Sequence, residues 1–363
     1  MAKFLVAIIL GCMLVTVASA GIRRVGLNQT YTTLTAAYTA AVNDDTLLIS
    51  PGGYNETITS TKRLHWIGAG YDRVTINGRL LLNSGSSGSS VDGIGLTSST
   101  NGSTVEIASA VDFIQFKRSS VKNTNTQRGQ VCTAIKRTTS PGGMLLLNEC
   151  IVTIRTSYEY PYGGFSRALE LNGDNLSIRN SIIALTDNNG TAVVGFSGTC
   201  QSFALENSAV VGFSQLFDLA GNFPFLFRNN IAHDWIGSGN WGTYPGGGTG
   251  WSYNASTTIT PQGSNTLLLA NDPFVNYDET ANYIYGNSDL HLANGSPCID
   301  AGDPAILDLD GSRSDMGIYG GPTPHVDGGA PNYPFTIAFD VPSSMTAGQQ
   351  LPIQATGRIG AGY

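Results

Sequence analysis

The sequence predicts an all-β protein, a right-handed parallel β-helix solenoid with an N-terminal capping helix and a short C-terminal β tail. Three observations carry this prediction. A strand-and-turn unit recurs through the middle of the chain, helical periodicity is nearly absent after residue 45, and the composition combines 45 glycines in 363 residues with only 12% charged residues. Such a chain is too apolar for disorder and too rich in glycine for a helical bundle.

Five segments share the repeated unit, in which a polar pair separates short runs of alternating or β-branched residues: FKRSSVKN, LLNECIVTI, SIRNSIIAL, ALENSAVVG and LFRNNIAHD. Aligned on Ser120, Cys150, Ser181, Ser208 and Asn230, they follow one another at steps of 30, 31, 27 and 22 residues. One unit is too short to bury an apolar face alone, whereas stacked units bury a continuous core. Parallel strands joined in one sense favour the right-handed form.

Asparagine recurs at one turn of this unit, at Asn123, Asn180, Asn207 and Asn229. Amide side chains at equivalent positions of successive coils can stack along a solenoid. The sequence therefore predicts an asparagine ladder along one edge of the coil.

The first twenty residues form a separate unit. Lys3 gives a positive start, residues 4–17 are apolar, and small residues at 18–20 precede Gly21. This pattern is typical of a secretory signal peptide cleaved after Ala20. The apolar run is shorter than the roughly 20 residues of a membrane span, so we expect a secreted or cell-surface protein with no membrane span.

The open end of a solenoid needs a cover. Tyr31, Leu34, Tyr38 and Ala41 lie at helical spacing, which predicts an amphipathic helix over about residues 33–42 that caps the first coil. Asp44 and Asp45 follow it and are interpreted as the turn that stops the helix.

Both ends of the predicted solenoid resemble known proteins. The segment LLISPGGYNETI, followed by LHWIGAG, resembles the entry to the secreted right-handed β-helix, or pectin-lyase-like, superfamily. The segment GSPCIDAGDPAILDLDGSRSDMGIYGG resembles a closing signature of bacterial exported β-helix proteins. The resemblance brackets about residues 27 to 322. It implies the fold and export, but this superfamily includes lyases, hydrolases, esterases, adhesins and proteins without known activity, so it does not fix the function.

The net charge limits the kinds of partner that the protein can bind, and the cysteine content limits the possible disulfides. The chain has a formal charge of −7, which becomes −8 without the signal peptide because that segment contains one lysine and no acid. This balance argues against nucleic acid as a partner. Four cysteines remain after the signal peptide. Two alternatives remain open for Cys132 and Cys150: they form a disulfide, or they are buried free thiols. Cys200 and Cys298 have no close partner in sequence.

The catalytic motifs of the superfamily are missing. The aspartate motifs of its glycosidases have no counterpart, and Asp112 in VDFIQF echoes a pectin methylesterase strand without that family's other motifs. The four histidines show no ligand spacing. A lyase would need a base near a calcium site. The candidates by residue type are Lys117, Lys122, Lys136, Arg118 and Arg137. We assign no catalytic residue, and whether the protein is an enzyme stays open, with the balance against it.

The segment DLDGSRSDMGIYGG contains three closely spaced acids, Asp308, Asp310 and Asp315. The spacing does not match an EF-hand, although carboxylates this close could hold Ca²⁺ together with backbone carbonyls. The favoured interpretation is structural, with the aspartates tying turns and the glycines letting the final coil close. Arg313 is expected to pair with one of the neighbouring acids, namely Asp300, Asp303 or Asp315.

Two loops are rich in aromatic residues and glycine. Exposed rings suit the apolar faces of sugars, so these loops predict a glycan-contacting face, with inward packing of the rings as the alternative. The rings are Trp235, Trp241, Tyr244, Trp251 and Tyr253 in one loop, and Tyr158, Tyr160 and Tyr162 in the other.

Taken together, we expect residues 21–322 to form the β-helix and residues 323–363 to form a linker and a short C-terminal β segment. The function predicted is an exported β-helix protein that binds polysaccharide or a cell-surface glycan, or has a structural role. The alternative is a carbohydrate-active enzyme, a polysaccharide lyase or hydrolase, with its site in a groove along the coil. Self-assembly through stacked coil ends is a third possibility.

Overall fold

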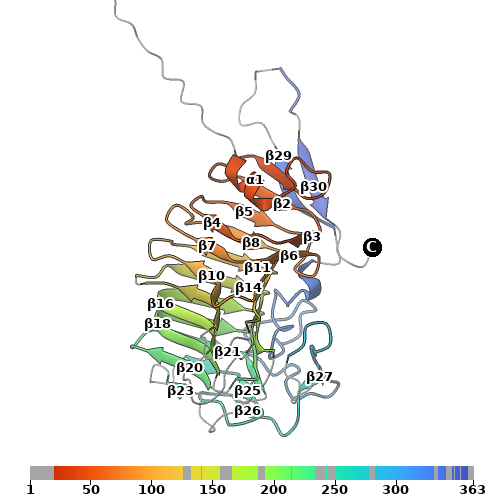
Figure 1. The fold of residues 1–363 in the computed structure, drawn as a ribbon. Coiled ribbons are helices and arrows are strands. Elements are labelled where there is room, and N and C mark those ends of the chain that lie inside the picture. Colours follow the sequence, from red (N-terminus) through yellow and green to blue (C-terminus); the bar gives the residue numbers. More distant parts are fainter. Residues whose placement is uncertain are drawn as a thin grey trace, which may run out of the picture.

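A computed structural model describes residues 20–125, 132–139, 141–155, 166–186, 193–213, 215–233, 242–243, 250–277, 283–330, 334–340, 346, 348–351 and 353–358. Its strands stack into successive coils, each of which contributes a strand to up to three parallel faces (Figure 1). The predicted parallel β-helix is therefore confirmed. The described part includes no helix that is long and apolar enough to cross a membrane.

The first face is a run of parallel strands that begins at the N-terminal coil. It consists of β1 (Ile22–Val25), β2 (Thr46–Ile49), β5 (His65–Ile67), β8 (Ser90–Asp92), β11 (Ile114–Lys117), β14 (Met144–Asn148), the second halves of β16 (Ser166–Arg179) and β18 (Val193–Glu206), β21 (Phe225–Arg228) and β24 (Trp251–Ser252).

The second face is a separate ten-stranded sheet. It consists of β3 (Gly52–Tyr54), β6 (Val74–Asn77), β9 (Gly95–Ser98), β12 (Ser120–Asn123), β15 (Ile151–Ile154), β17 (Ile182–Leu185), β19 (Ala209–Val211), β22 (Ile231–His233), β25 (Ala255–Ser256) and β26 (Leu267–Leu268).

The third face joins the first through β16 and β18, which continue from one face into the next. Its other strands are β4 (Ile58–Ser60), β7 (Leu80–Leu82), β10 (Gly102–Ile107), β13 (Cys132–Arg137), β20 (Gln215–Ala220) and β23 (Gly242–Thr243).

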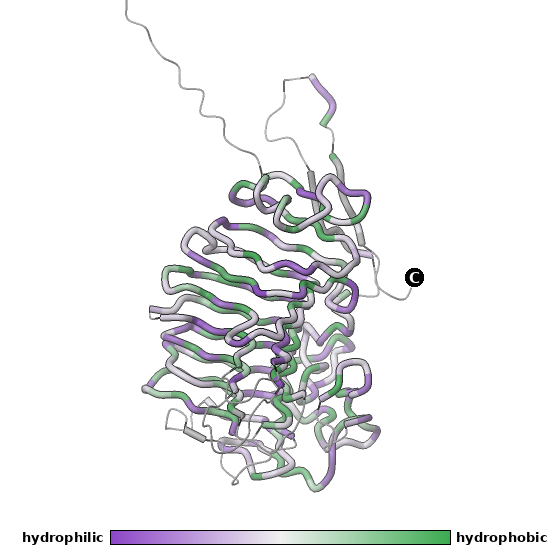
Figure 2. The backbone as a smooth tube through the Cα atoms, in the orientation of Figure 1, coloured by the Kyte–Doolittle hydropathy of each residue, from purple (hydrophilic) through white to green (hydrophobic). Residues whose placement is uncertain are grey.

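Alternating side chains of these strands fill the interior of the coil. In β11 and β14, for example, buried residues alternate with partly exposed ones, as a pleated strand with one face on a core requires. Phenylalanines stack on one another in the later coils, with the rings of Phe196 and Phe217 5.7 Å apart. Hydrophobic stretches accordingly recur from coil to coil in Figure 2.

The turn between the first and second faces repeats one backbone conformation. From β8 onward each coil places a residue with positive φ there, and three of these residues are asparagines, Asn180, Asn207 and Asn229, with φ of 48°, 45° and 57°. Asparagine suits this position because its short polar side chain tolerates the left-handed region. The three asparagines occupy equivalent positions, but a side-chain contact of the predicted ladder is found only between Asn229 and Asn207, at 3.3 Å. Asn123 is not part of it, because it lies within β12.

The position that follows each left-handed residue forms a second ladder of hydrogen bonds. The amide of Cys150 donates to the hydroxyl of Ser181 at 3.0 Å, and the amide of Ser181 donates to Ser208 at 3.2 Å. Because Ser120 pairs with Ile151, the residue in register with Cys150 is Ser119. The sequence alignment on Ser120 was therefore wrong by one residue.

The capping helix α1 (Leu34–Ala40) begins one residue after its N-cap Thr33 and buries Leu34 and Ala37. Its two ends are held by charged side chains of the first coil. Glu56 accepts hydrogen bonds from the amides of Leu34 and Thr35 at 2.8 Å, and Lys62 donates to the carbonyls of Tyr38 and Ala41 at 2.7 Å. A seven-residue helix is too short to be stable by itself, so these contacts and its burial hold it.

After β26 the chain turns back and runs along the outside of the second face. Residues 269–330 are called the lateral segment below; residues 278–282 of it lie outside the described part. Successive residues of this segment meet the coils in reverse order. Asp303 bonds to Asn229, Asp315 to Asn207, Ile318 to Asn180 and Gly328 to Tyr71. The aspartate-rich signature therefore does not close the final coil, as the sequence suggested; it lies along the side of the helix (Figure 1).

The lateral segment buries the outer surface of the second face. Ile182, Ala209 and Ile231 pack there against Leu290, Met316 and Ile318, all of them buried. As a result β15, β17, β19 and β22 are buried at every position. The protein thus has two hydrophobic cores, one inside the coil and one beneath the lateral segment.

The chain's remaining elements are short. Within the lateral segment β27 (Phe274–Asn276) and β28 (Asp289–Leu292) form an antiparallel pair, and Asp327–Gly329 forms the 3-10 turn η1. β29 (Phe335–Asp340) and β30 (Gln354–Arg358) form an antiparallel hairpin in the predicted C-terminal β tail. The four cysteines are free thiols, and Cys132, Cys150 and Cys298 are buried. The disulfide alternative for Cys132 and Cys150 is therefore wrong.

Candidate functional site

Most of the aromatic residues predicted to contact glycans lie outside the described residues. These are Trp235, Trp241, Tyr244, Tyr158, Tyr160 and Tyr162. Their role stays a prediction.

The structure describes two aromatic residues of this set, one of them buried and the other partly buried. Trp251 is 3% exposed and its ring lies 4.5 Å from that of Phe227, within the core of the coil. Tyr253 has a φ of 53° and lies beneath the guanidinium of Arg313, 5.5 Å from its carbon. The expectation of exposed rings is therefore corrected at Trp251, and the alternative of inward packing applies there.

The three aspartates of the proposed calcium site accept hydrogen bonds from nearby backbone amides and so stabilise turns. Asp308 accepts hydrogen bonds from the amides of Asp315 and Gly321, Asp310 accepts from Ser312, and Asp315 accepts from the amide of Asp300 at 2.7 Å. Within the described residues no group of three or more His, Cys, Asp or Glu side chains is placed to hold a metal. Calcium at these residues stays a prediction.

The expected partner of Arg313 was wrong. Its guanidinium donates to the backbone carbonyls of Gly302 and Ala301. Asp303, one of its proposed partners, pairs at 2.9 Å with Arg228 of the coil, which joins the lateral segment to the first face.

Four of the five basic residues considered as lyase bases are paired with acids. Lys117 lies 3.7 Å from Glu149, Lys136 lies 3.0 Å from Glu170, Arg118 pairs with Asp92, and Arg137 forms a buried pair with Asp174. The fifth, Lys122, is half-buried. Its pKa is lowered by burial and by the charge of Arg155. These contacts indicate a structural role for the first four.

A pocket of about 440 Å³ opens between the second face and the lateral segment. Ile151 of β15 and Ile182 of β17 line it from the coil, and Tyr71 lines it from the turn between β5 and β6. The remaining lining residues belong to the lateral segment: Asn276, Tyr283, Tyr285, Gly286, Asn287, Ser288, Asp289, Leu290, His291, Tyr319, Asp327 and Gly328.

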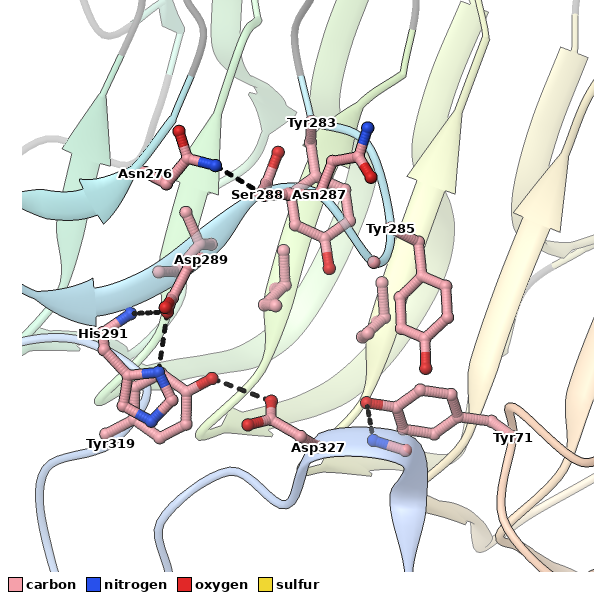
Figure 3. A pocket seen from close by; sticks show the side chains of 15 residues that line it. Tyr71, Asn276, Tyr283, Tyr285, Asn287, Ser288, Asp289, His291, Tyr319 and Asp327 are labelled. Atoms are coloured by element: carbon pink, nitrogen blue, oxygen red, sulfur yellow. Dashed lines mark hydrogen bonds and ion pairs between the residues drawn. The ribbon is translucent and has the colours of Figure 1, made fainter.

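Aromatic rings stand at both ends of this pocket (Figure 3). Tyr71 and Tyr285 meet edge to face at one end, with ring centroids 5.6 Å apart. At the other end the ring of His291 stacks on Tyr319 at 3.7 Å, with an interplanar angle of 10°. Tyr285 is 49% exposed, so its ring face is accessible to a ligand.

Two carboxylates complete the polar lining. The hydroxyl of Tyr319 donates to Asp327 at 2.8 Å, and Asp289 accepts from the backbone amide of His291 at 3.0 Å and from its Nδ1 at 2.7 Å. Burial alone raises the pKa of Asp289, but these bonds from His291 outweigh it, so the net pKa is lowered. Asp289 is therefore an ionised acceptor at neutral pH.

The tyrosines of the pocket are hydrogen-bond donors at neutral pH. Burial raises the pKa of Tyr285 to about 12, and the charges of Asp72 and Asp327 act in the same direction. The pKa values of Tyr71, Tyr283 and Tyr319 are also raised, chiefly by burial. The pocket thus combines neutral phenol groups, one accessible tyrosine ring at Tyr285 and carboxylate acceptors.

Sequence reasoning missed this pocket. Most of its lining comes from Tyr71, from the stretch YIYGNSDLH at 283–291, from Tyr319 near the end of the closing signature and from Asp327 and Gly328 beyond it, more than 200 residues after Tyr71. The local signal was the pair of tyrosines at 283 and 285, separated by one residue, followed by Asp289 and His291 at strand spacing. Nothing in the sequence showed that the lateral segment returns to the early coils.

Comparisons with known proteins give limited similarity. No family model matches the chain, and no curated protein matches it. Among solved structures it is similar to the pectate lyase Pel9A, with 13% identity, a TM-score of 0.39 and coverage of 84% of this chain and 97% of that one. It is also similar to a pectin methylesterase from Aspergillus niger, with 15% identity, a TM-score of 0.32 and coverage of 70% and 88%, respectively.

Proposed function

We propose that this chain is an exported β-helix protein that binds polysaccharide in the pocket between the second face and the lateral segment. The observation that carries the proposal is the set of four tyrosines beside two carboxylates in a pocket of about 440 Å³. Ring faces pack on the C–H surface of a sugar, while carboxylates and phenols bond to its hydroxyls. Export is supported by the leader-like pattern of residues 1–20.

Asp289 is poorly suited to act as the general acid of a glycosidase. A glycosidase needs one carboxyl group that stays protonated to serve as the general acid. The hydrogen bonds from His291 stabilise the charged form of Asp289 and lower its pKa. A carbohydrate-active enzyme is kept as the second candidate because Asp289 and Asp327 line one pocket.

The test is retention of the mature protein, Gly21 to Tyr363, on a panel of immobilised plant, algal and bacterial polysaccharides. Tyr285→Ala removes an accessible ring from the pocket. Phe113→Ala is the matched control, because Phe113 is 47% exposed and lies in the turn before β11, outside the pocket. We expect Tyr285→Ala to weaken retention about fivefold and Phe113→Ala to leave it unchanged, since one stacking ring contributes roughly 1 kcal/mol.

Retention that is equal in both variants would contradict the proposal. Release of shorter sugars from any polymer, abolished by Asp327→Asn, would instead establish the enzyme. Both outcomes are read from the same samples, by analysing the bound protein and the soluble products.

A further inference from the structure

The charge of the pocket restricts the sugars it can accept. Among the described residues that line it are two carboxylates, Asp289 and Asp327, and no lysine or arginine. The described residues show no ion pair from an arginine or lysine to either carboxylate, and His291 adds positive charge only when it is protonated. The pocket is therefore negative at neutral pH.

The rings reinforce this preference. The face of a tyrosine ring carries negative charge density, and a cation held within about 6 Å of it is attracted. Tyr71 and Tyr285 stand at one end of the pocket, and Asp327 lies between them and the pair of His291 and Tyr319 (Figure 3). An aromatic ring and a carboxylate in the same pocket both attract an ammonium group.

We propose that the pocket binds a cationic amine, and that its ligand is a polysaccharide with unacetylated amino sugars. This inference rests on the proposed function and deepens it by naming the ligand class. A uronate polymer would place its carboxylates next to two carboxylates of the protein, and like charges at such distances repel. The amine is held by Asp327 and the exposed ring of Tyr285, while Asn276, Ser288 and the tyrosine hydroxyls bond to the sugar hydroxyls.

The experiment compares equilibrium binding of three oligosaccharides of equal length to the mature protein. The probes are glucosamine oligomers, their N-acetylated counterparts and galacturonate oligomers. Asp327→Asn removes the charge in the pocket with little change of shape. Asp218→Asn removes one charge from an exposed position of β20 outside the pocket and is the matched control. The melting temperature of each variant checks that it is folded.

We expect the glucosamine oligomers to bind at least tenfold more tightly than the other two probes. Asp327→Asn should remove about tenfold of this affinity and Asp218→Asn none, because a charge contact in a partly buried site is worth about 1.4 kcal/mol, a factor of ten. The binding of glucosamine oligomers should also weaken as the pH rises and the ligand amine loses its proton.

Three results would count against the inference or its basis. Equal or tighter binding of the N-acetylated or galacturonate oligomers would overturn the amine ligand while leaving polysaccharide binding intact. Binding of a sugar-free amine, tetramethylammonium, as tight as that of glucosamine oligomers would support the cation site and contradict the polysaccharide ligand. Failure of all four probes to bind would overturn both.

Discussion

At the scale of single residues, the left-handed position in the turn between the first and second faces joins the coil to the lateral segment. Asn229 is fully buried with a φ of 57°, and its side-chain oxygen accepts from the amide of Asp303 at 2.8 Å. Its backbone carbonyl accepts from the amide of Gly317 at 2.7 Å. Asn229 thus adopts a backbone conformation that few residues tolerate, and it also provides hydrogen-bond acceptors for the buried amides of a distant segment.

We predict that Asn229→Ala lowers the free energy of unfolding by about 2 to 4 kcal/mol. Alanine costs about 1 kcal/mol in the left-handed region, and loss of the amide leaves the buried N–H of Asp303 unsatisfied, at about 1 to 3 kcal/mol. The matched control is Asn265→Ala, because Asn265 has a φ of 55° but is exposed. Chemical denaturation should show only about 1 kcal/mol for the control, and equal losses would contradict the role assigned to the Asn229 side chain.

At the scale of elements, α1 depends on two charged side chains of the coil it covers. Glu56 bonds to the amides at its N-terminus, where negative charge is favoured, and Lys62 bonds to carbonyls at its C-terminus. Sequence periodicity predicted the helix, but neither Glu56 nor Lys62 is adjacent to it in sequence.

Replacing Glu56 with glutamine should destabilise the cap by about 1 to 2 kcal/mol, because two charge-assisted bonds to helix amides become neutral ones. Hydrogen exchange of the α1 amides is the measurement, and faster exchange confined to α1 and the first coil is the expected result. Unchanged exchange in α1 would show that burial of Leu34 and Ala37 alone holds the helix.

The lateral segment is the second element with a testable contact, through His325. This histidine is 5% exposed, and its Nδ1 donates to the carbonyl of Asn180 at 3.0 Å. Its Nε2 lies 3.3 Å from the hydroxyl of Tyr71. Burial lowers its pKa, with an opposing effect of Asp327, so the folded protein favours the neutral ring.

Stability should therefore fall on acidification. Because the unfolded chain binds this proton more readily than the folded protein, the contribution is complete above the unfolded pKa of about 6.5 and is lost as the pH decreases below it. We expect a lower urea midpoint at pH 5 than at pH 7.5 and a smaller difference between the two in His325→Gln. An identical pH dependence in the variant would exclude His325 as a source.

At the scale of the whole molecule, burial explains why part of the architecture was predictable and part was not. The strand pattern and the repeat predicted the coil. In segments such as IQFK at 114–117, apolar and polar residues alternate because one side of the strand faces the core and the other faces outward. The continuous apolar runs IIAL at 182–185 and AVV at 209–211 indicate strands that are buried on both faces of the sheet. They indicate a cover over this face without identifying it, so the lateral segment and the pocket beneath it could not be predicted from the sequence.

A substitution under the lateral segment should cost as much as one inside the coil. Ile231 is fully buried on the outer surface of β22, beside Gly317. We predict a loss of about 2 to 4 kcal/mol of unfolding free energy for Ile231→Ala, the usual range for a buried isoleucine. Val275→Ala, at a position 55% exposed, is the control, with an effect within about 0.5 kcal/mol. A small loss at Ile231 would mean that the lateral segment contributes little to the folded state.

Binding of a polysaccharide in the pocket beneath the lateral segment is tested directly by hydrogen exchange of the mature protein, with and without a polysaccharide fragment that it retains. Ligand in the pocket should slow exchange at residues 283–291 and 326–328, because these amides lie in the loop and turn that line it. Protection confined to residues 235–253, or to the outer surface of the first face, would place the binding site elsewhere and contradict the account.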